Sequence, residues 1–267
     1  MTAVAGLTVR DVRGEAEMSA CCALYRSVMA LGPGDGSINP RLLTGIQHNG
    51  GHVVGAFLGP RLVGFAYSFL GRDPARPTAL YQYSALAVVD EGMQDRGIGR
   101  RLKLAQRERC LAAGIERMRW TFDPFKTRNA HMNLDVLGGE VIALNPAMYG
   151  ARGFGADRDD ESDRFVVEWP LARTGPVPAW PAPAARDWRE GDAVVDGDQV
   201  LIAVPARWER RRAELGTPGA TALRRDVRAS FAEALGTGRV GVSCVRVGAD
   251  LAVYRFVPRD RPQWTDG

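Results

Sequence analysis

The spacing of hydrophobic residues divides the first third of the chain into one strand, two helices and three strands. Apolar residues first alternate with polar ones, then recur at helical spacing over two segments, and then form three mostly apolar runs bounded by turn residues. The run that ends at Val89 is long and apolar enough to be buried on both faces of a sheet. The expected elements lie at residues 7–12, 15–29, 40–48, 52–58, 62–70 and 80–89.

Beyond Val89, helices and strands alternate. A helix with one apolar stripe follows a glycine-containing turn, and Gly114 provides its stop. Arg100, Lys103 and Arg107 lie on the polar side of this helix. Helices are expected at 99–113 and 129–137, strands at 115–122, 140–148 and 163–171, and loops at 71–77 and 150–162. This order predicts an α/β fold with a mixed sheet. It also contains a strand–helix–strand unit, which binds ligands at the carboxyl end of its first strand.

The proline-rich stretch from Arg173 to Arg186 predicts an extended linker. We therefore expect three parts, at residues 1–172, 173–197 and 198–267. The last part reads as a β-α-α-β-β lobe, with a helix break at Gly216–Gly219 and a hairpin around Gly248–Asp250. This order repeats that of residues 7–70, which suggests a degenerate half copy. The alternative is that strand–helix–helix–hairpin is simply a common small unit.

The stretch between Val89 and Leu102 leaves a buried strand, turns through two glycines and opens a basic helix. Backbone N–H groups at such a junction lack partners, and the helix dipole favours an anion there. Gly97 and Gly99 would let a ligand approach the backbone closely. The loop is neither a P-loop nor the dinucleotide fingerprint, because Gly-Lys-Ser/Thr and a third glycine are both missing. Two glycines alone are an ambiguous anion site, since any strand–turn–helix can carry them.

The pattern Gln94-x-x-Gly97-x-Gly99 resembles the pyrophosphate-binding loop of the GNAT superfamily of N-acyltransferases. The order of elements agrees with the GNAT layout over residues 7–171. Other stretches resemble a subgroup of larger bacterial GNAT-type proteins with an extra C-terminal portion, some of which acylate amino acids with acetyl or succinyl donors. These stretches are Trp120–Pro124, Asn129–Asn133, Leu137-Gly138 and Tyr149-Gly150.

The resemblance implies that acetyl-CoA or another acyl-CoA is the co-substrate and that no metal is needed. The glycine loop would hold the diphosphate, and the preceding strand, which splays from its neighbour in the family, would bond the pantetheine arm. Two asparagines a helical turn apart would face that arm, although Asn129 could instead cap its helix. The expected cofactor-binding residues are Leu86, Val88, Gln94, Arg96, Gly97, Ile98, Gly99, Arg100, Arg101, Asn129 and Asn133.

The proton carriers depart from the family pattern. Many GNAT enzymes use a tyrosine before the Leu-Gly turn to protonate the departing thiolate, and that position is Leu134 here. Tyr149 is a candidate substitute, with packing at a strand end as the alternative. Asp123 could bind the substrate ammonium or accept its proton, or could only shape the turn into the following proline. Ser84 lies on the strand where the family often keeps its base. The catalytic candidates are therefore Tyr149, Asp123 and Ser84.

Composition narrows the partners. The net charge of +4 and the pI near 9.1 come almost wholly from arginine, since Lys103 and Lys126 are the two lysines. No aromatic-interleaved basic patch predicts nucleic-acid binding, and the arginines at 207–212 alternate with acidic residues. No apolar run is long enough for a membrane span, and the N-terminus lacks a secretory pattern, so we expect a cytoplasmic protein. The four cysteines show no metal spacing.

The sequence therefore predicts an N-acyltransferase that moves an acetyl or other short acyl group from acyl-CoA to a primary amine of a small molecule, with an amino acid as one option. The amine would attack the thioester directly in a ternary complex. The alternative is a non-catalytic acyl-CoA-binding or sensing module, which the missing tyrosine favours. A homodimer is allowed, and the sequence does not identify the acceptor, the acyl chain or the role of the C-terminal lobe.

Overall fold

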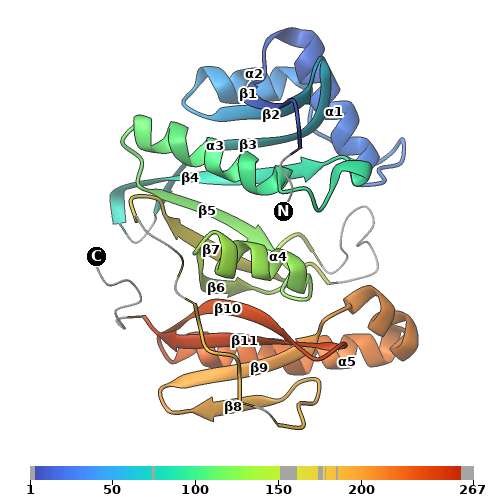
Figure 1. Cartoon of the computed structure of the whole chain (residues 1–267), viewed down its shortest axis with the longest axis vertical. Helices are drawn as coiled ribbons and strands as arrows, with labels where there is room; N and C mark the ends of the chain where they lie inside the picture. Colours follow the sequence, from blue (N-terminus) through green and yellow to red (C-terminus); the bar gives the residue numbers. More distant parts are fainter. Residues whose placement is uncertain are drawn as a thin grey trace. The chain divides into compact units, whose positions relative to one another are not determined.

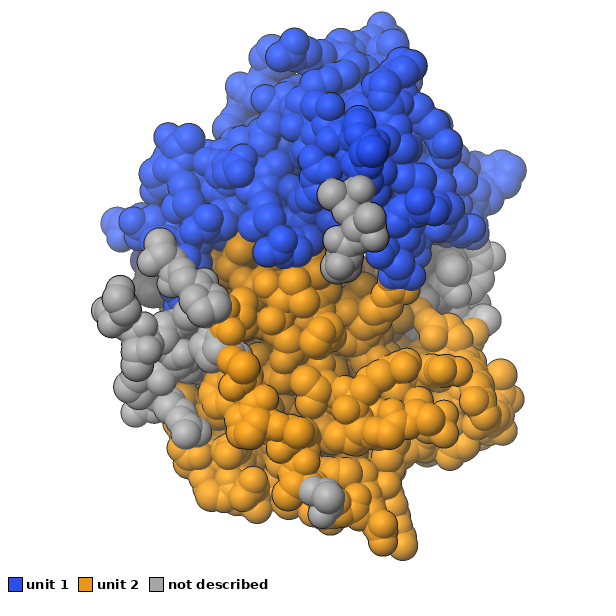
Figure 2. Space-filling view, viewed as in Figure 1, with its two compact units in different colours: residues 1–120, 154–158, 170–173 blue, residues 121–153, 159–169, 174–267 orange. Residues whose placement is uncertain are grey.

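The computed structural model describes residues 4–73, 76–150, 161–173, 177, 179–184 and 186–259. These residues form two compact units (Figure 2). Unit 1 contains the described residues up to Trp120 together with Pro170–Arg173, and unit 2 contains the remaining described residues. The boundary falls inside a strand rather than at the proline-rich linker. The two compact units thus differ from the three parts expected from the sequence, whose boundaries lie at residues 172 and 197. Those domain boundaries stay a prediction.

Unit 1 is an antiparallel sheet that ends in one parallel pair (Figure 1). Its strands lie in the order β1-β2-β3-β4-β5, and β4 pairs with β5 in parallel. The elements are β1 (Leu7–Asp11), α1 (Gly14–Val28), α2 (Pro40–His48), β2 (His52–Leu58), β3 (Arg61–Asp73), β4 (Arg76–Val89), the 3-10 turn η1 (Glu91–Met93), α3 (Ile98–Ala112) and β5 (Arg117–Phe122).

The helices of unit 1 cover opposite faces of its sheet, because successive strand residues point to opposite sides. On one face, Phe65 of β3 packs in a cluster with Met18 of α1 and Leu43 of α2. On the other face, the next residue, Ala66, packs with Leu102 of α3. All five side chains are at most 2% exposed. The sheet of unit 1 is therefore buried on both sides.

The predicted loop at residues 71–77 is wrong for most of its length. β3 continues to Asp73 and β4 begins at Arg76, and the two strands pair through Gly71↔Tyr81. The composition of this stretch suggested a loop, but Gly71 has another reason to be there. A Cβ on Gly71 would lie 2.5 Å from the ring of Tyr81, so the glycine makes room for an aromatic side chain within the ladder. Residues 74 and 75 lie outside the described part.

Unit 2 contains an antiparallel sheet with the strand order β7-β6-β10-β11-β9-β8. It begins with the end of β5, followed by a short helix that continues as a π-helical turn. The elements are α4 (Thr127–His131), η2 (Met132–Val136), β6 (Glu140–Asn145), β7 (Arg164–Pro170), β8 (Ala193–Asp196), β9 (Gln199–Pro205), α5 (Trp208–Gly236), β10 (Arg239–Val247) and β11 (Leu251–Pro258).

An aromatic cluster explains why β6 and β7 group with the C-terminal strands. The ring of Phe165, on β7, lies 4.7 Å from that of Phe231 on α5 and 5.6 Å from that of Tyr254 on β11. Phe122 and Phe256 complete the cluster. Buried aromatic rings contribute large areas to a core. The C-terminal segment therefore packs against β7 and pairs with β6, and is not attached only by its linker.

The C-terminal segment confirms the predicted order of elements and adds one. The two expected helices form α5, which breaks at Gly216, where φ is 65° and ψ is 173°. β8 was not predicted. The proposed half copy does not fit the strand order. β11 lies between β9 and β10, whereas β2 lies between β1 and β3 in the corresponding N-terminal set. A common small unit explains the repeated order better.

Within the described ranges, no helix combines the length and the apolar character needed to cross a membrane. Among the same residues, no three His, Cys, Asp or Glu side chains gather into a group that could hold a metal ion.

Candidate functional site

The protein's own hydrogen bonds shape the loop between β4 and α3. Asp90 follows β4, and its Oδ1 accepts a hydrogen bond from the backbone N–H of Gly92 at 3.0 Å. Its Oδ2 lies 2.7 Å from a guanidinium nitrogen of Arg61. The side chain of Gln94 donates to the carbonyl of Val89 at 3.3 Å, so it braces the loop. Gly97 then precedes α3 with a φ of 76°, a conformation that favours glycine.

The first turn of α3 begins without a side-chain cap. Gly97 is the N-cap residue and supplies no side-chain hydrogen bond to the helix. A Cβ on Gly99 would have no atom of the described residues within 4 Å, and its φ is not positive, so neither packing nor backbone conformation requires a glycine there. A ligand that approaches the backbone closely would explain a glycine at this position. Arg96 and Arg100 are exposed beside it, whereas Arg101 donates to the carbonyl of Leu7 at 2.9 Å.

β4 and β5 form a fork. Their parallel pairing joins Gln82 to Met118 and Tyr83 to Arg119, and within the described residues no register pair follows these two. On its other edge β4 stays paired with β3 as far as Val89, with a register shift that leaves Ala85 as an extra residue. Such a bulge re-aims the residues that follow it. The stretch from Ser84 to Val89, which includes Leu86 and Val88, therefore has no described register partner in β5.

The comparisons with known proteins give the fold. Two solved structures superpose on this chain with TM-scores of 0.50. One is yncA from Salmonella typhimurium with its cofactor acetyl-CoA, 17% identical, covering 66% of this chain and 99% of that one. The other is the ribosomal-protein-S18-alanine N-acetyltransferase from Escherichia coli, 12% identical, covering 65% and 99%. An acetyltransferase of the GNAT family from Streptococcus pneumoniae superposes with a TM-score of 0.46 at 15% identity, covering 61% and 98%.

The chain has the GNAT acetyltransferase fold. No family model matches the sequence, and no curated protein matches it. The superposed proteins are matched almost over their full length, while about a third of this chain has no counterpart in them. The predicted fold class is confirmed, and this chain is a larger version of it.

Unit 2 holds the two asparagines predicted to line the pantetheine arm. Asn129 is exposed, whereas Asn133 is 7% exposed. Asn129 lies in α4 and Asn133 in the π-helical turn that continues it, and their shared role toward the arm stays a prediction. The alternative role of Asn129 as a helix cap is wrong, because α4 begins at Thr127 with Lys126 as its N-cap residue.

A buried hydrophobic residue occupies the position that carries a tyrosine in many GNAT enzymes. Leu134 is fully buried in η2. Tyr149, the candidate substitute, is 57% exposed, and its hydroxyl lies 3.3 Å from the hydroxyl of Thr121. The guanidinium of Arg164 lies 5.5 Å from the centre of its ring. Tyr149 is thus a solvent-facing phenol on the surface of unit 2 rather than a packed ring.

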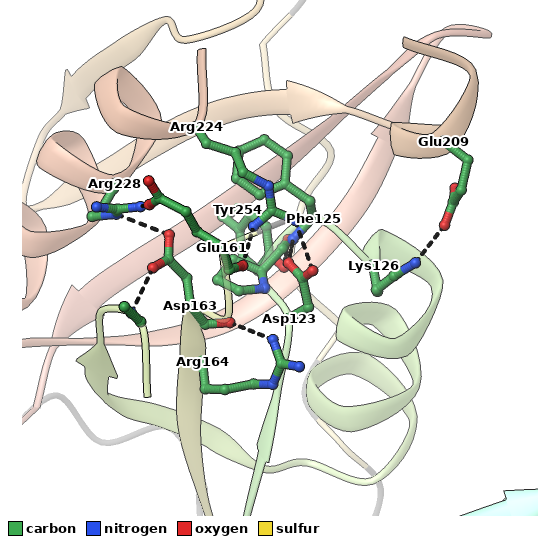
Figure 3. Close-up of polar contacts among 12 residues, drawn as sticks. Asp123, Phe125, Lys126, Glu161, Asp163, Arg164, Glu209, Arg224, Arg228 and Tyr254 are labelled. Atoms are coloured by element: carbon green, nitrogen blue, oxygen red, sulfur yellow. Dashed lines mark hydrogen bonds and ion pairs between the residues drawn. The ribbon is translucent and has the colours of Figure 1, made fainter. Parts of the chain in front are cut away.

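Asp123 shapes the turn after β5, which was the alternative predicted from the sequence, and it also pairs with α5 (Figure 3). It is 5% exposed, and both of its oxygens are used. Oδ1 accepts from the backbone N–H of Phe125 at 2.8 Å, and Oδ2 accepts from the guanidinium of Arg224 at 2.8 Å. Arg224 itself lies 4.6 Å and 4.8 Å from the ring centres of Phe125 and Trp208. This geometry favours a clamp between α5 and the turn after β5 over proton transfer by Asp123.

Ser84 leads to residues that the sequence analysis missed. Its hydroxyl is buried on the α3 side of the sheet, accepts from Nζ of Lys103 at 2.8 Å, and donates to Oε1 of Gln106 at 2.9 Å. The sequence placed Lys103 on the polar side of α3, yet it is 7% exposed. One signal could have found it: this is one of only two lysines among 35 basic residues. Arginine stays charged, whereas lysine can lose its proton when buried.

Proposed function

We propose that the protein is an N-acyltransferase that transfers an acetyl or other short acyl group from acyl-CoA to a primary amine of a small molecule. The observation that carries this proposal is the uncapped first turn of α3, with Gly99 in open space, directly after a β4 strand that parts from β5. The GNAT fold supports it. The acetyl-CoA bound to yncA supports the choice of donor. The acceptor differs among the superposed proteins, since the Escherichia coli enzyme acts on the alanine of a ribosomal protein.

The residues present fit acyl-CoA. The amides of the first turn of α3 would hold the diphosphate, assisted by the exposed Arg96 and Arg100. The pantetheine arm would pair with β4 along Leu86 and Val88, where β4 lacks β5 as a neighbour. Asn129 and Asn133 remain candidates for binding pantetheine.

The reaction needs three events. The neutral amine attacks the thioester carbonyl, an amide of β4 near the fork stabilises the oxyanion, and the departing thiolate takes up a proton. Tyr149 and Ser84 remain candidates for proton transfer, and Asp123 is better explained as a clamp.

A thiol-release assay tests this function. Acetyl-, propionyl- and succinyl-CoA would be offered with a panel of amino acids, aminosugars and polyamines, and we expect turnover with at least one pair. Binding of acyl-CoA measured by calorimetry, without turnover on any amine, would support the sensing module instead. Absence of acyl-CoA binding would overturn both.

Replacing Gly99 tests the cradle itself. Gly99→Ala should weaken CoA binding by about 10-fold or more, because the new methyl group would occupy the space left for the diphosphate. Its stability should not fall, since a helical glycine is itself unfavourable by roughly 0.5–1 kcal/mol. Gly45→Ala is the matched control: Gly45 is also helical, lies on α2, and would gain a Cβ with no atom of the described residues within 4 Å, so CoA binding should not change. Equal affinity of the Gly99 variant would contradict the proposed cradle.

A further inference from the structure

A group of polar side chains is buried between α3 and the sheet of unit 1. We call it the fork cluster, because it lies where β4 and β5 part. Its members are between 0% and 7% exposed. They are Ser68, Gln82, Ser84, Lys103 and Gln106. Buried polar groups are costly unless they have partners, so a cluster of this size needs an explanation.

Lys103 is the charged member of the fork cluster. Its Nζ donates to the hydroxyl of Ser84 at 2.8 Å and lies 4.0 Å from the centre of the Trp120 ring. Among the described residues, no carboxylate lies within ion-pair distance of it. Burial lowers the pKa of Lys103 to about 7, so both protonation states are populated near neutral pH. The other titratable group that acts on it is Cys110, whose pKa burial raises to about 12.

The position of Lys103 follows from the strand register. Tyr83 and Arg119 are the last register pair of β4 and β5. The next residues along the two strands are Ser84 and Trp120, which are the two side chains that Nζ contacts. The amine therefore lies across the mouth of the fork, on the α3 side.

Two further atoms of the fork cluster are left without hydrogen-bond partners. Oε1 of Gln82 and Nε2 of Gln106 are buried and unsatisfied, and both residues are fully buried. A packed structural cluster would be expected to satisfy these atoms. Their presence beside Ser84 and Lys103 indicates a polar site that is completed by something other than the protein.

We propose that Lys103 is the proton donor to the sulfur of the departing CoA, in place of the tyrosine whose position is occupied by Leu134. This inference rests on the proposed function, which brings the thioester to the fork. The amine nitrogen bonds to the carbonyl carbon, the carbon–sulfur bond breaks, and its electron pair goes to sulfur. An N–H proton of the Lys103 ammonium moves to that sulfur and gives the CoA thiol. The acylated substrate nitrogen releases one proton to solvent. The Lys103 side chain, now a neutral amine, takes up a proton from solvent and becomes an ammonium again.

Ser84 is a positioning residue in this scheme. It holds Nζ by accepting from it, and Gln106 fixes the serine by accepting its proton. A lysine suits this task because it can give up a proton near neutral pH, which an arginine cannot.

The test is the acidity of bound CoA, because no acceptor is needed to measure it. Thiolate absorbance would be followed against pH for the CoA complex, with the desulfo-CoA complex subtracted. Transfer of the thiol proton to the neutral Lys103 amine should make thiolate absorbance appear at lower pH than in free CoA. The shift should disappear in Lys103→Met. The protein's own thiols interfere little, since burial raises the pKa of Cys21 and Cys110 to about 12 and raises those of Cys22 and Cys244.

Arg107→Met is the matched control. It also removes a cation from α3, but this guanidinium donates to the carbonyls of Leu171 and Arg173. The bound-thiol pKa should stay low in this variant. If wild type and Lys103→Met both bind CoA with the same thiol pKa, Lys103 is not beside the sulfur and the proposal fails. If wild type does not bind CoA, the proposed function fails as well.

A second measurement does not depend on how the Lys103 variant folds. In Lys126→Arg, Lys103 is the only lysine, so [15N]lysine labelling gives a single side-chain signal. Adding CoA should raise the pKa of that amine, whereas desulfo-CoA should not, because the coupling between thiolate and ammonium is reciprocal. An identical titration with both ligands would overturn the proposal. Once the thiol-release assay has identified an acyl-CoA and an amine that react, Lys103→Met should also lower kcat by about 100-fold. The decrease of kcat at alkaline pH should be absent in this variant.

Discussion

Two buried cations, one from each unit, lie against a tryptophan and differ in their counter-ions. In unit 2, Arg224 is 2% exposed, lies 4.8 Å from the Trp208 ring centre, and is paired with Asp123 at 2.8 Å. In unit 1, Lys103 is 7% exposed and lies 4.0 Å from the Trp120 ring centre, but its polar partner is the hydroxyl of Ser84.

The difference separates a structural role from a chemical one. A buried arginine with a carboxylate keeps its charge and holds two segments together, here α5 and the turn after β5. A buried lysine without a carboxylate is destabilised in its charged form and so becomes able to exchange a proton. Two similar environments thus give opposite results, because the two cations differ both in side-chain type and in the presence of a carboxylate.

The largest expected effect comes from breaking the pair in unit 2. Asp123→Ala should lower the free energy of unfolding by about 3–5 kcal/mol, because it leaves the Arg224 charge buried without its partner. Urea denaturation measures the loss. The double variant Asp123→Ala with Arg224→Met should recover part of it, since the uncompensated charge is then gone. A loss below about 1 kcal/mol in the single variant would show that the pair is not the clamp we describe.

Removing the buried cation of unit 1 should stabilise the protein, whereas breaking the pair in unit 2 destabilises it. Lys103→Met is expected to raise the free energy of unfolding at pH 6 by an amount on the order of a few kcal/mol, because a desolvated charge is lost. The folded-state pKa of Lys103, about 7, lies below its ordinary value of 10.5. The unfolded chain therefore binds more protons between these values, so wild-type stability rises with pH across that window and the advantage of the variant shrinks.

Denaturation at pH 6, 7.5 and 9 checks this dependence. Arg107→Met should show no such convergence, because its guanidinium does not titrate in that range. A constant difference between wild type and Lys103→Met at all three pH values would mean that the lysine keeps its proton when folded, which would remove the contrast with Arg224.

The fold was largely predictable because its signals are local. The end of β4, the glycine at the start of α3 and the break at Gly216 follow from hydrophobic spacing and from backbone conformations that favour glycine. Two failures had non-local causes. Gly71 serves the ring of Tyr81 across the ladder, and the strand order of the C-terminal segment depends on which strand pairs with β6.

In the candidate site, too, local features were predictable from the sequence and non-local contacts were not. The turn at Gly97 and the start of α3 were predictable because their residues are consecutive, whereas the pairing of Asp123 with Arg224 and the burial of Lys103 were not. Asp123 meets Arg224, which is 101 residues away in sequence. Lys103 was assigned to the polar face of α3, because helical periodicity cannot show that a polar residue meets a polar stretch of sheet. The pairing of β4 with β5 brings Ser84 beside Trp120, and the packing of α3 against the sheet brings Lys103 to both.

The smallest expected effect concerns the other lysine, which completes the comparison. Lys126 pairs with Glu209 at 2.6 Å, and the two side chains are 25% and 65% exposed. Lys126→Met should therefore change the free energy of unfolding by only about 0.2–1 kcal/mol, and less in 1 M salt, because solvent screens an exposed pair. Urea denaturation at low and high salt measures this, with Glu209→Gln as the partner control. A loss as large as that of Asp123→Ala would show that exposure does not set the strength of these pairs. The contrast between Arg224 and Lys103 would then need another explanation than burial with or without a carboxylate.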